Sequence, residues 1–461
     1  MMLRFAGCLL LMVGAGLAWS QESGGQVPAL SDSAVATAAS VEGTVYVTRQ
    51  NGRQGLLVRG AGVQQGETIH TARNSVVRLK LADGGETVIR PESSLVLQDF
   101  RYKASEPAED SLVLRLIRGG LRAVTGAVGK RGNQDAYKLI TKTATIGIRG
   151  TDFSARVCDQ DCGEPLRAAQ GARATPVAAR AVQLVGAVSV SRGNAPTTLA
   201  LDKPLYPGDI VETGTGAYAV LVFRDNSRLT VNPSTRFVLT RYEFDTTAKG
   251  EPPSMFVELL KGGLRFATGL IGKSNPRMVQ LRTATATLGI RGTVFDFACG
   301  PASSPDAATQ AQLGAMSCDQ SLFVNTRSGT VVMSGDLGGE LLVFEGQSGR
   351  VDGAQMAARA IDGTPEYFKS LSTPAPESFP AKLDQLFGVQ ASGESDNGVY
   401  VTVHEGRVLL AQGPADVTLD AGESAFAGQS LVPVKLFNAP GVLDRDPFLS
   451  SGRFTSNMCR R

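Results

Sequence analysis

An internal repeat constrains the fold of this chain more than any other feature of its sequence. The segment LIRGGLRAVTGAVGK, which ends at Lys130, returns as LLKGGLRFATGLIGK, which ends at Lys273, at an offset of 143 residues. The segment TKTATIGIRGT, which ends at Thr151, returns as TATATLGIRGT, which ends at Thr293, at an offset of 142 residues. An offset this steady indicates two copies of one folding unit of about 142 residues.

Each copy has the sequence pattern of short strands joined by tight turns. In the first copy, apolar residues at every second position of 77–81 alternate with Arg78 and Lys80, and a glycine-rich turn follows at 83–85. The second copy repeats this alternation over 219–223. We therefore predict an all-β fold of tandem repeated modules, with short, mainly antiparallel strands and little helix. A sandwich and a short solenoid both fit this pattern.

The outer positions of this strand differ between the copies. Arg78 and Lys80 in the first copy become Val220 and Val222 in the second. An apolar second face has to be covered by another part of the protein or by a partner. Contact with the other copy or with a linker is one interpretation, and a binding surface is the other. Val220 and Val222 are therefore candidate interaction residues.

Composition and the repeat divide the chain into segments. Arg4, the apolar run that ends at Leu17 and the small residues before position 21 have the layout of a secretory signal peptide cut after Ser20. Stretches rich in Pro, Ala, Ser and Gly predict linkers. The predicted segments are a signal peptide (1–20), the first copy (41–162), a linker (163–180), the second copy (181–351), a linker with a short helix over 381–387 (352–397), a C-terminal β segment (398–445) and a flexible tail (446–461). The C-terminal β segment could belong to either copy, and residues 328–332 resemble it weakly in sequence.

Five cysteines remain once the expected signal peptide is removed. An exported compartment permits disulfides, and an odd number leaves one thiol over. Both pairs follow the repeated small-residue strand, so we predict Cys158–Cys162 and Cys299–Cys318 disulfides, with Cys459 left over. A metal site or a redox-active pair at Cys158 and Cys162 is the alternative. The sequence shows neither a four-ligand zinc set nor thioredoxin-like spacing there.

Basic residues recur at equivalent positions of the two copies. The pairs are Arg118 and Lys261, Arg122 and Arg265, Lys130 and Lys273, and Arg149 and Arg291. A surface that binds anions or glycans would use such residues, whereas solvated strand edges and internal ion pairs explain them equally well. We name Arg122, Arg265, Arg149 and Arg291 as further candidate interaction residues.

The titratable residues do not suggest catalysis. The chain has two histidines, His70 and His404, and His70 aligns with Glu212, so the repeat does not preserve a histidine site. We expect both histidines at the surface. The net charge of +3 is too small to indicate nucleic-acid binding.

Acidic residues are not preserved between the copies either. Asp152 aligns with Val294, and Asp296 aligns with Ser154. A repeated acid–base pair would retain its carboxylates, and no nucleophile elbow, Ser-Lys pair or HExxH motif is present. We therefore expect a non-enzymatic protein without a metal or another cofactor.

The combination of repeated motifs resembles the FecR domain. Each copy has a Gly-x-Val-x-Val or similar opening, a Gly-Glu or Gly-Asp with a later Thr, an Asp-led hairpin before a Pro, the LxxGGLR block and the TATxGIRGT block. The resemblance covers 41–156 and 184–298, and the stretch 398–428 resembles the end of such domains. In that family the domain lies outside the cytoplasm and relays receptor occupancy through protein contacts. The family's sigma-regulating segment and transmembrane helix have no counterpart in this sequence.

We therefore expect a periplasmic or secreted protein-interaction or sensory module, acting in transmembrane signalling. The expected partner is another envelope protein, either a membrane signalling protein or a receptor. The alternative is a cell-envelope carbohydrate-binding module whose basic residues contact peptidoglycan. No 18-residue apolar run follows the signal peptide, so we expect no transmembrane segment in the mature chain.

Overall fold

A computed structural model describes most of the chain between residues 34 and 444. The described ranges are 34–131, 133, 135–159, 161–162, 176–193, 195–201, 203–244, 252–301, 317–335, 339–353, 357–389, 397–428 and 432–444, without the side chain of Arg291. The expected signal peptide, the flexible tail with Cys459 and much of the first linker lie outside these ranges.

The first sheet has 15 described strands and includes both the first repeat and the C-terminal segment. Its strands are β1 (Ala34–Glu42), β2 (Val45–Thr48), β3 (Gln54–Leu56), β4 (Gly62–Gln64), β5 (Thr68–Thr71), β6 (Val76–Leu81), β7 (Glu86–Ile89), β8 (Ser94–Arg101), β9 (Ser111–Val124), β10 (Tyr137–Ile140), β11 (Thr145–Cys158), β28 (Gly398–Gln412), β29 (Ala415–Asp420), β30 (Ser424–Gly428) and β31 (Val434–Leu436). We call this unit module 1.

The second sheet has 16 described strands and is continuous in sequence. Its strands are β12 (Ala179–Val185), β13 (Val188–Ser191), β14 (Thr197–Thr198), β15 (Pro204–Leu205), β16 (Ile210–Thr213), β17 (Tyr218–Phe223), β18 (Arg228–Val231), β19 (Arg236–Glu243), β20 (Ser254–Lys261), β21 (Gly263–Ala267), β22 (Val279–Arg282), β23 (Ala286–Gly300), β24 (Ser321–Gly335), β25 (Glu340–Phe344), β26 (Ser348–Asp352) and β27 (Ala358–Ile361). We call this unit module 2.

The described helices are short and lie between strands. They are η1 (Pro107–Glu109), α1 (Leu270–Ser274), η2 (Pro276–Met278), α3 (Glu366–Ser370), η3 (Pro376–Ser378), α4 (Leu383–Phe387) and α5 (Gly441–Asp444). The helix predicted over 381–387 is α4. The prediction of an all-β fold with little helix is confirmed.

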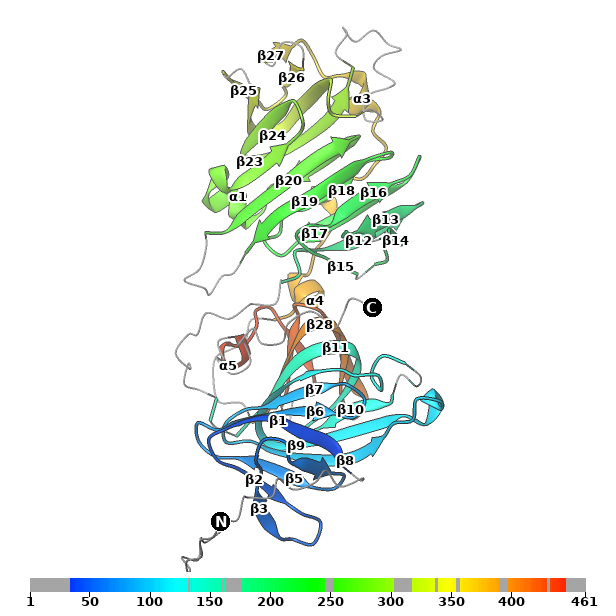
Figure 1. Cartoon of the computed structure of the whole chain (residues 1–461). Coiled ribbons are helices and arrows are strands. Elements are labelled where there is room, and N and C mark those ends of the chain that lie inside the picture. The colour runs from blue at the N-terminus through cyan, green and yellow to red at the C-terminus, as the bar shows by residue number, and fades with distance from the viewer. Residues whose placement is uncertain are drawn as a thin grey trace, which may run out of the picture.

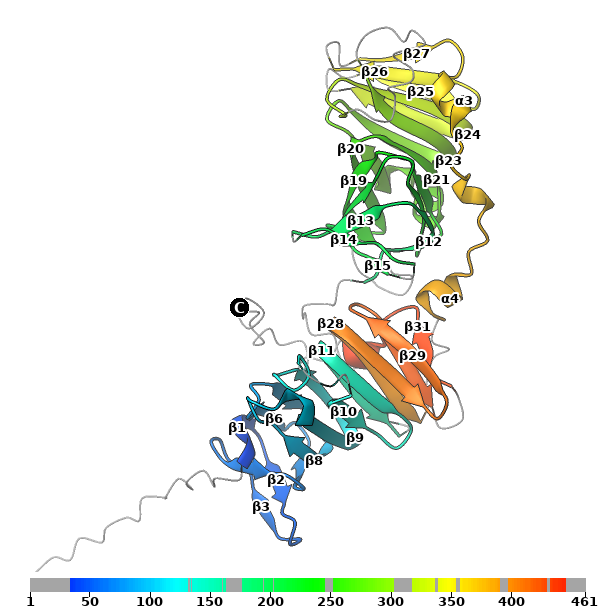
Figure 2. The same ribbon diagram turned by 90° about the vertical axis from the view of Figure 1, so that its right-hand side faces the viewer.

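The C-terminal segment completes module 1. Strand β28 pairs antiparallel along the whole of β11, from Thr145 opposite Ala411 to Cys158 opposite Gly398. Valines and leucines of β28 lie in the same buried core as those of β9 and β11. Figures 1 and 2 show the orange C-terminal strands beside the cyan strands of the lower unit. Module 2 is thus an insertion within module 1, which answers the question that the sequence left open.

In each module, one long β stretch bends and changes its pairing partners part-way along. This stretch is β9 in module 1 and β20 with β21 in module 2. The first half of β9 pairs with β8 and β10, and its second half pairs with β7 and β11. The change of partners falls at Gly119, which has φ +77 and lies so close to Ser93 that a side chain would not fit. Gly262 has φ +90 beside Thr235 in module 2, where it separates β20 from β21. The repeated glycine pair therefore marks an equivalent bend in each unit.

Among the described strands, the pairing is antiparallel except for one strand pair in each module. Strands β9 and β10 are parallel in module 1, and β20 and β22 are parallel in module 2. Each module has its own apolar core. The two modules are therefore separate β units rather than turns of a continuous solenoid (Figure 1).

The linker that returns to module 1 covers the outer face of module 2. Thr230 donates its hydroxyl to the carbonyl of Pro374, and Arg228 donates to the carbonyls of Glu377 and Phe379. Helix α4 then brings Phe387 against Val222. The chain therefore packs its own linker against this face before it enters β28.

Candidate functional site

The two valines proposed as a binding surface are not accessible. Val220 and Val222 have no exposed surface. Val222 belongs to a small apolar cluster with Val177, Tyr206 and Phe387, at the junction of the modules. The interpretation as a free binding surface is therefore wrong, and contact with a linker and the other module accounts for the apolar outer positions.

Two of the four candidate arginines form internal ion pairs. Arg122 forms a bidentate ion pair with Asp152, with N–O distances of 2.9 and 2.7 Å. In module 2, Arg265 binds Asp296, a fully buried carboxylate that also binds Arg327. These guanidinium groups are satisfied by carboxylates of their own module, so Arg122 and Arg265 are structural residues rather than a free anion-binding surface.

His404 is not a surface residue, contrary to the prediction. It is half-buried, and its Nε2 lies 2.8 Å from the hydroxyl oxygen of Ser154. Burial and the positive charge of Arg122 lower its pKa to about 4, against an opposing effect of Asp152. A serine–histidine contact suggests a nucleophile and base, but Ser154 is fully buried and inaccessible to a substrate. This pair is therefore part of the interior hydrogen bonding.

His70 is likewise half-buried and hydrogen-bonded. Its two ring nitrogens lie 3.1 Å from the hydroxyl of Thr48 and 2.9 Å from that of Ser94. Burial and the charge of Arg118 lower its pKa. Both histidines thus have structural partners.

Arg149 is the candidate residue that remains exposed, and it lies in a groove. The groove has a volume of about 770 Å³ and is lined by residues of β11, β28 and β29 and of the segment between β9 and β10. Its charged lining residues are Lys130, Arg149 and Arg407, together with the carboxylates of Asp135 and Asp420. Arg149 stands directly opposite Arg407 across the β11–β28 pair. Arg407 contacts Asp420 at 2.8 Å, whereas Lys130 and Arg149 form no ion pair with any residue that the structure describes. Two cations facing each other repel, so this position favours an anionic ligand.

The equivalent position of module 2 has a different character. Thr330 replaces Arg407 opposite Arg291, and Phe344 replaces Asp420 on the neighbouring strand. Lys273, the counterpart of Lys130, is exposed, as are Arg118 and Lys261. The side chain of Arg291 lies outside the described part of the structure. The cationic groove is therefore a feature of module 1.

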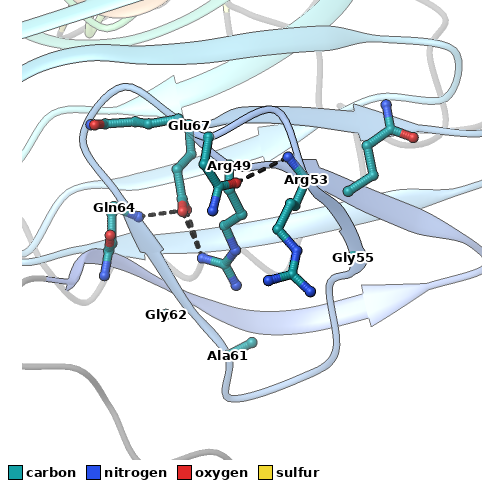
Figure 3. Close-up of a pocket in the computed structure, with 10 residues that line it drawn as sticks. Arg49, Arg53, Gly55, Ala61, Gly62, Gln64 and Glu67 are labelled. Carbon is teal, nitrogen blue, oxygen red and sulfur yellow. Dashed lines mark hydrogen bonds and ion pairs between the residues drawn. The ribbon is translucent and has the colours of Figure 1, made fainter.

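A second hollow lies in the part of module 1 that contains residues 49–67, which we call its tip (Figure 3). It has a volume of about 650 Å³ and is lined by Arg49, Arg53 and Glu67, together with several amide side chains. Buried Glu67 accepts two hydrogen bonds from Arg49, at 2.7 and 2.9 Å, and one from the backbone of Gln64. Arg53 forms no ion pair with a described residue.

The same arginine–carboxylate pair exists at the tip of module 2. Arg192 contacts Asp209 at 2.7 Å, and both residues line a hollow of about 300 Å³. The residues align with Arg49 and Glu67 at the repeat offsets of 143 and 142, a signal that our sequence analysis missed. In module 2 this tip lies against module 1, because Gly406, Arg407, Asp420 and Ala421 complete the lining of the hollow.

The cysteines pair as the repeat suggests. Cys158 is joined to Cys162, and Cys299 is joined to Cys318. Asp161 lies near the first pair, and these three residues form a cluster of metal-ligand type. With both sulfurs in a disulfide, the cluster lacks the thiolates that a soft metal ion requires. Arg156 instead donates to Cys162 at 3.2 Å and binds Asp161 at 2.7 Å.

The fold defines a duplicated all-β protein whose modules share one core plan. The regions 67–166 and 209–313 each match the family model described as FecR protein. The chain therefore carries two FecR-like domains, as the motifs predicted, and the FecR match supports a regulatory or signalling module. No curated protein matches the chain.

Two crystal structures of a putative anti-sigma factor from Parabacteroides distasonis resemble parts of the chain. The first has 14% sequence identity and a TM-score of 0.26, and the match covers 35% of this chain and 62% of that protein. The second has 12% identity and a TM-score of 0.26, with coverage of 46% and 98%. The chain thus matches about three fifths of the first of these structures. Among the described residues, no helix is long and apolar enough to span a bilayer.

Proposed function

We propose that this chain is a non-enzymatic signalling or regulatory module that works outside the cytoplasm and binds an acidic segment of another envelope protein. The two FecR-like domains support the regulatory role. The signal-like N-terminus and the two disulfides support export, because disulfides persist in oxidising compartments. In the FecR family, such domains relay receptor occupancy through protein contacts, and this proposal extends that role to the present chain.

One observation carries the proposed binding site. Arg149 and Arg407 face each other across β11 and β28, and Lys130 lines the same groove. A carboxylate-bearing segment would relieve the repulsion between the two guanidinium groups and give Arg149 a charge-assisted hydrogen bond. The expected partner therefore presents Asp or Glu side chains in an exposed loop or strand.

The test is cross-linking with mass spectrometry on envelopes that contain a tagged form of the chain. We expect one dominant cross-linked membrane protein with the wild type, and its loss with Arg149→Glu or Lys130→Glu. Lys273→Glu makes the same change at the equivalent exposed position of module 2 and should retain the partner. Intact mass on the same sample should show a mature chain that begins near Gln21. Equal capture by the wild type and Arg149→Glu would overturn the assigned site.

A cell-envelope glycan is the second candidate ligand. It is favoured by the same observation, since Lys130 and Arg149 have no acidic partner among the described residues and an acidic glycan would neutralise them. Sedimentation with purified peptidoglycan separates the two candidates. Co-sedimentation at low salt that Arg149→Glu abolishes would favour the glycan. Its absence, with a protein cross-link present, would favour the protein partner.

A further inference from the structure

The contact between the two modules joins a tip to a turn. The turn is Asp420–Glu423, which connects β29 to β30 in module 1, and the tip of module 2 carries the Arg192–Asp209 pair. Tyr206 of the tip donates its hydroxyl to the backbone carbonyl of Ala421 at 2.5 Å. Arg180, which is almost fully buried, binds Glu423 of the same turn. A tip of one module and a turn of the other therefore form a docking pair.

Each module has both a tip and a turn. The contact between the modules uses the tip of module 2 and the turn of module 1, so the tip of module 1 and the turn of module 2 take no part in it. The unused turn is Phe344–Gln347 of module 2, which has the same construction as Asp420–Glu423. In both turns the last residue donates its N–H to the first residue's carbonyl, and a glycine lies third with φ +77 or +78. In both, the last side chain accepts a hydrogen bond from the first residue's N–H. The unused tip is that of module 1, with its hollow of about 650 Å³ (Figure 3).

The unused tip and the unused turn lie at opposite ends of the molecule. In Figures 1 and 2 the β3 tip lies at the lower end and the β25–β27 region at the upper end. One molecule therefore cannot bring its own pair together, but two molecules placed end to end can. A contact between unlike surfaces of identical chains builds a ring if it closes and a filament if it does not.

The chemistry of the unused pair is matched on its two sides. In the internal contact, Lys203 of the tip and Asp420 of the turn line one hollow. At the repeat-equivalent positions of the unused pair, Ala61 lines the tip hollow and Phe344 begins the turn. A basic residue of the tip and an acidic residue of the turn are thus both replaced by apolar residues.

Exposed residues around the unused pair extend this match. Phe344 is 50% exposed and Leu342, on the same strand face, is 48% exposed. On the tip, Leu56 is 65% and Val58 is 51% exposed. Edge strands with exposed apolar side chains tend to pair with another chain.

The charges at the two ends are also complementary. Exposed Glu345 follows Phe344 in the unused turn, while Arg53 of the tip forms no ion pair with a described residue. We propose that copies of this protein associate head to tail, with the Phe344–Gln347 turn of one copy bound in the module 1 tip of the next.

Sedimentation velocity of the full mature chain over a range of concentrations tests this association. We expect the sedimentation coefficient to rise with concentration and to pass the value of a dimer. Phe344→Asp and Leu56→Asp should each abolish this rise, because each puts a charge into one side of the contact. Ile117→Asp, at a 52% exposed position of β9 that belongs to neither the tip hollow nor the turn, is the matched control and should sediment as the wild type does. Circular dichroism checks that every variant is folded.

A mixture of the two monomeric variants gives the sharper result. Phe344→Asp retains an intact tip and Leu56→Asp retains an intact turn, so an equimolar mixture should form dimers and nothing larger. A mixture that stays monomeric would overturn the proposal. So would a wild type that is monomeric at every concentration, or an association that only one of the two substitutions weakens, since that would indicate contact between like surfaces.

Discussion

The two modules pair an equivalent arginine with carboxylates from different positions. Arg122 in module 1 and Arg265 in module 2 are equivalent. Arg265 binds Asp296, which stands directly opposite it on the neighbouring strand, whereas the residue opposite Arg122 is Ser154. Arg122 instead binds Asp152, two residues earlier on that strand. The carboxylate has moved by one strand period, so it stays on the same face of the sheet.

The third partner of each cluster changes together with the carboxylate. His404 and Arg327 occupy equivalent bulges of β28 and β24, beside the changed position. With serine at 154 the neighbour is a histidine, and with aspartate at 296 it is a second arginine. Each module therefore pairs its arginine with a carboxylate of its own, and module 2 adds a second, more exposed arginine to the cluster. Asp152 and Asp296 do not align in the repeat, yet each binds the equivalent arginine of its own module.

The largest effect should come from removing the buried carboxylate of module 2. Asp296→Ala leaves Arg265 buried without its partner and should lower the free energy of unfolding by about 3–5 kcal/mol. Asp152→Ala in module 1 should cost less, because Arg122 and Asp152 are both partly exposed. Urea titration followed by circular dichroism measures both values. The only tryptophan lies in the expected signal peptide, so fluorescence would not report on the modules. Equal losses in the two variants would contradict the comparison.

The disulfides should also contribute unequally to the two modules. Cys299–Cys318 closes a loop of 19 residues, and its removal by a double serine substitution should cost about 3 kcal/mol. Cys158–Cys162 spans four residues, for which the same loop-entropy relation gives about 2 kcal/mol. Thermal unfolding of the two double variants, compared with the oxidised wild type, tests the order. A larger loss at Cys158–Cys162 would mean that loop closure is not the main contribution.

A smaller effect should follow from giving module 2 the charge arrangement of module 1. Val294→Asp combined with Asp296→Ser places a carboxylate where Asp152 stands in module 1, within reach of Arg265. We expect the double variant to recover about 1.5 kcal/mol relative to Asp296→Ser alone, the lower end of the range for a hydrogen bond to a charged group. The recovery should be incomplete because Arg327 keeps no equivalent partner. Urea titration of both variants decides, and a double variant no more stable than Asp296→Ser would show that the two positions are not interchangeable.

The sequence predicted the features that depend on short local patterns or on motifs present in both copies. Alternation over 77–81 and 219–223 predicted strands, the run of prolines that ends at Pro380 preceded the predicted helix α4, and the repeated blocks placed both disulfides. The membership of β28 was not predictable in this way. Its pairing with β11 joins residues about 250 positions apart. The sequence of β28 shares little with that of its counterpart β24 beyond Gly406, which corresponds to Gly329. A pairing of that range is decided by the fit of whole surfaces.

The candidate site was harder to predict than the fold. A repeated arginine has the same sequence signature whether it is a ligand contact or an interior ion pair, and only burial distinguishes Arg149 from Arg122. The partner of Arg122 was hidden because Asp152 aligns with a valine. Arg49 and Glu67 could have been found, since both have like-charged counterparts in the second copy.

The smallest predicted effect is a pH dependence confined to module 1. His404 has a folded pKa of about 4 against an ordinary value of 6.5, so it is neutral in the folded chain and gains a proton on unfolding at moderately acidic pH. Its stabilising contribution is therefore complete above about pH 6.5 and is lost as the pH falls towards about 4. Arg122 and Asp152 face the ring, and Ser154 is its hydrogen-bond partner.

His404→Gln keeps a hydrogen-bonding group beside Ser154 but cannot be protonated, so it should flatten the decline in module 1 stability over that pH range. Urea titrations at several pH values measure the slope. His70→Gln is the comparison variant and should also reduce the slope, because the pKa of His70 is lowered too. Module 2 has Arg327 at the position of His404 and should not show this decline. If the slope is unchanged in His404→Gln, carboxylates rather than this histidine control acid unfolding of module 1.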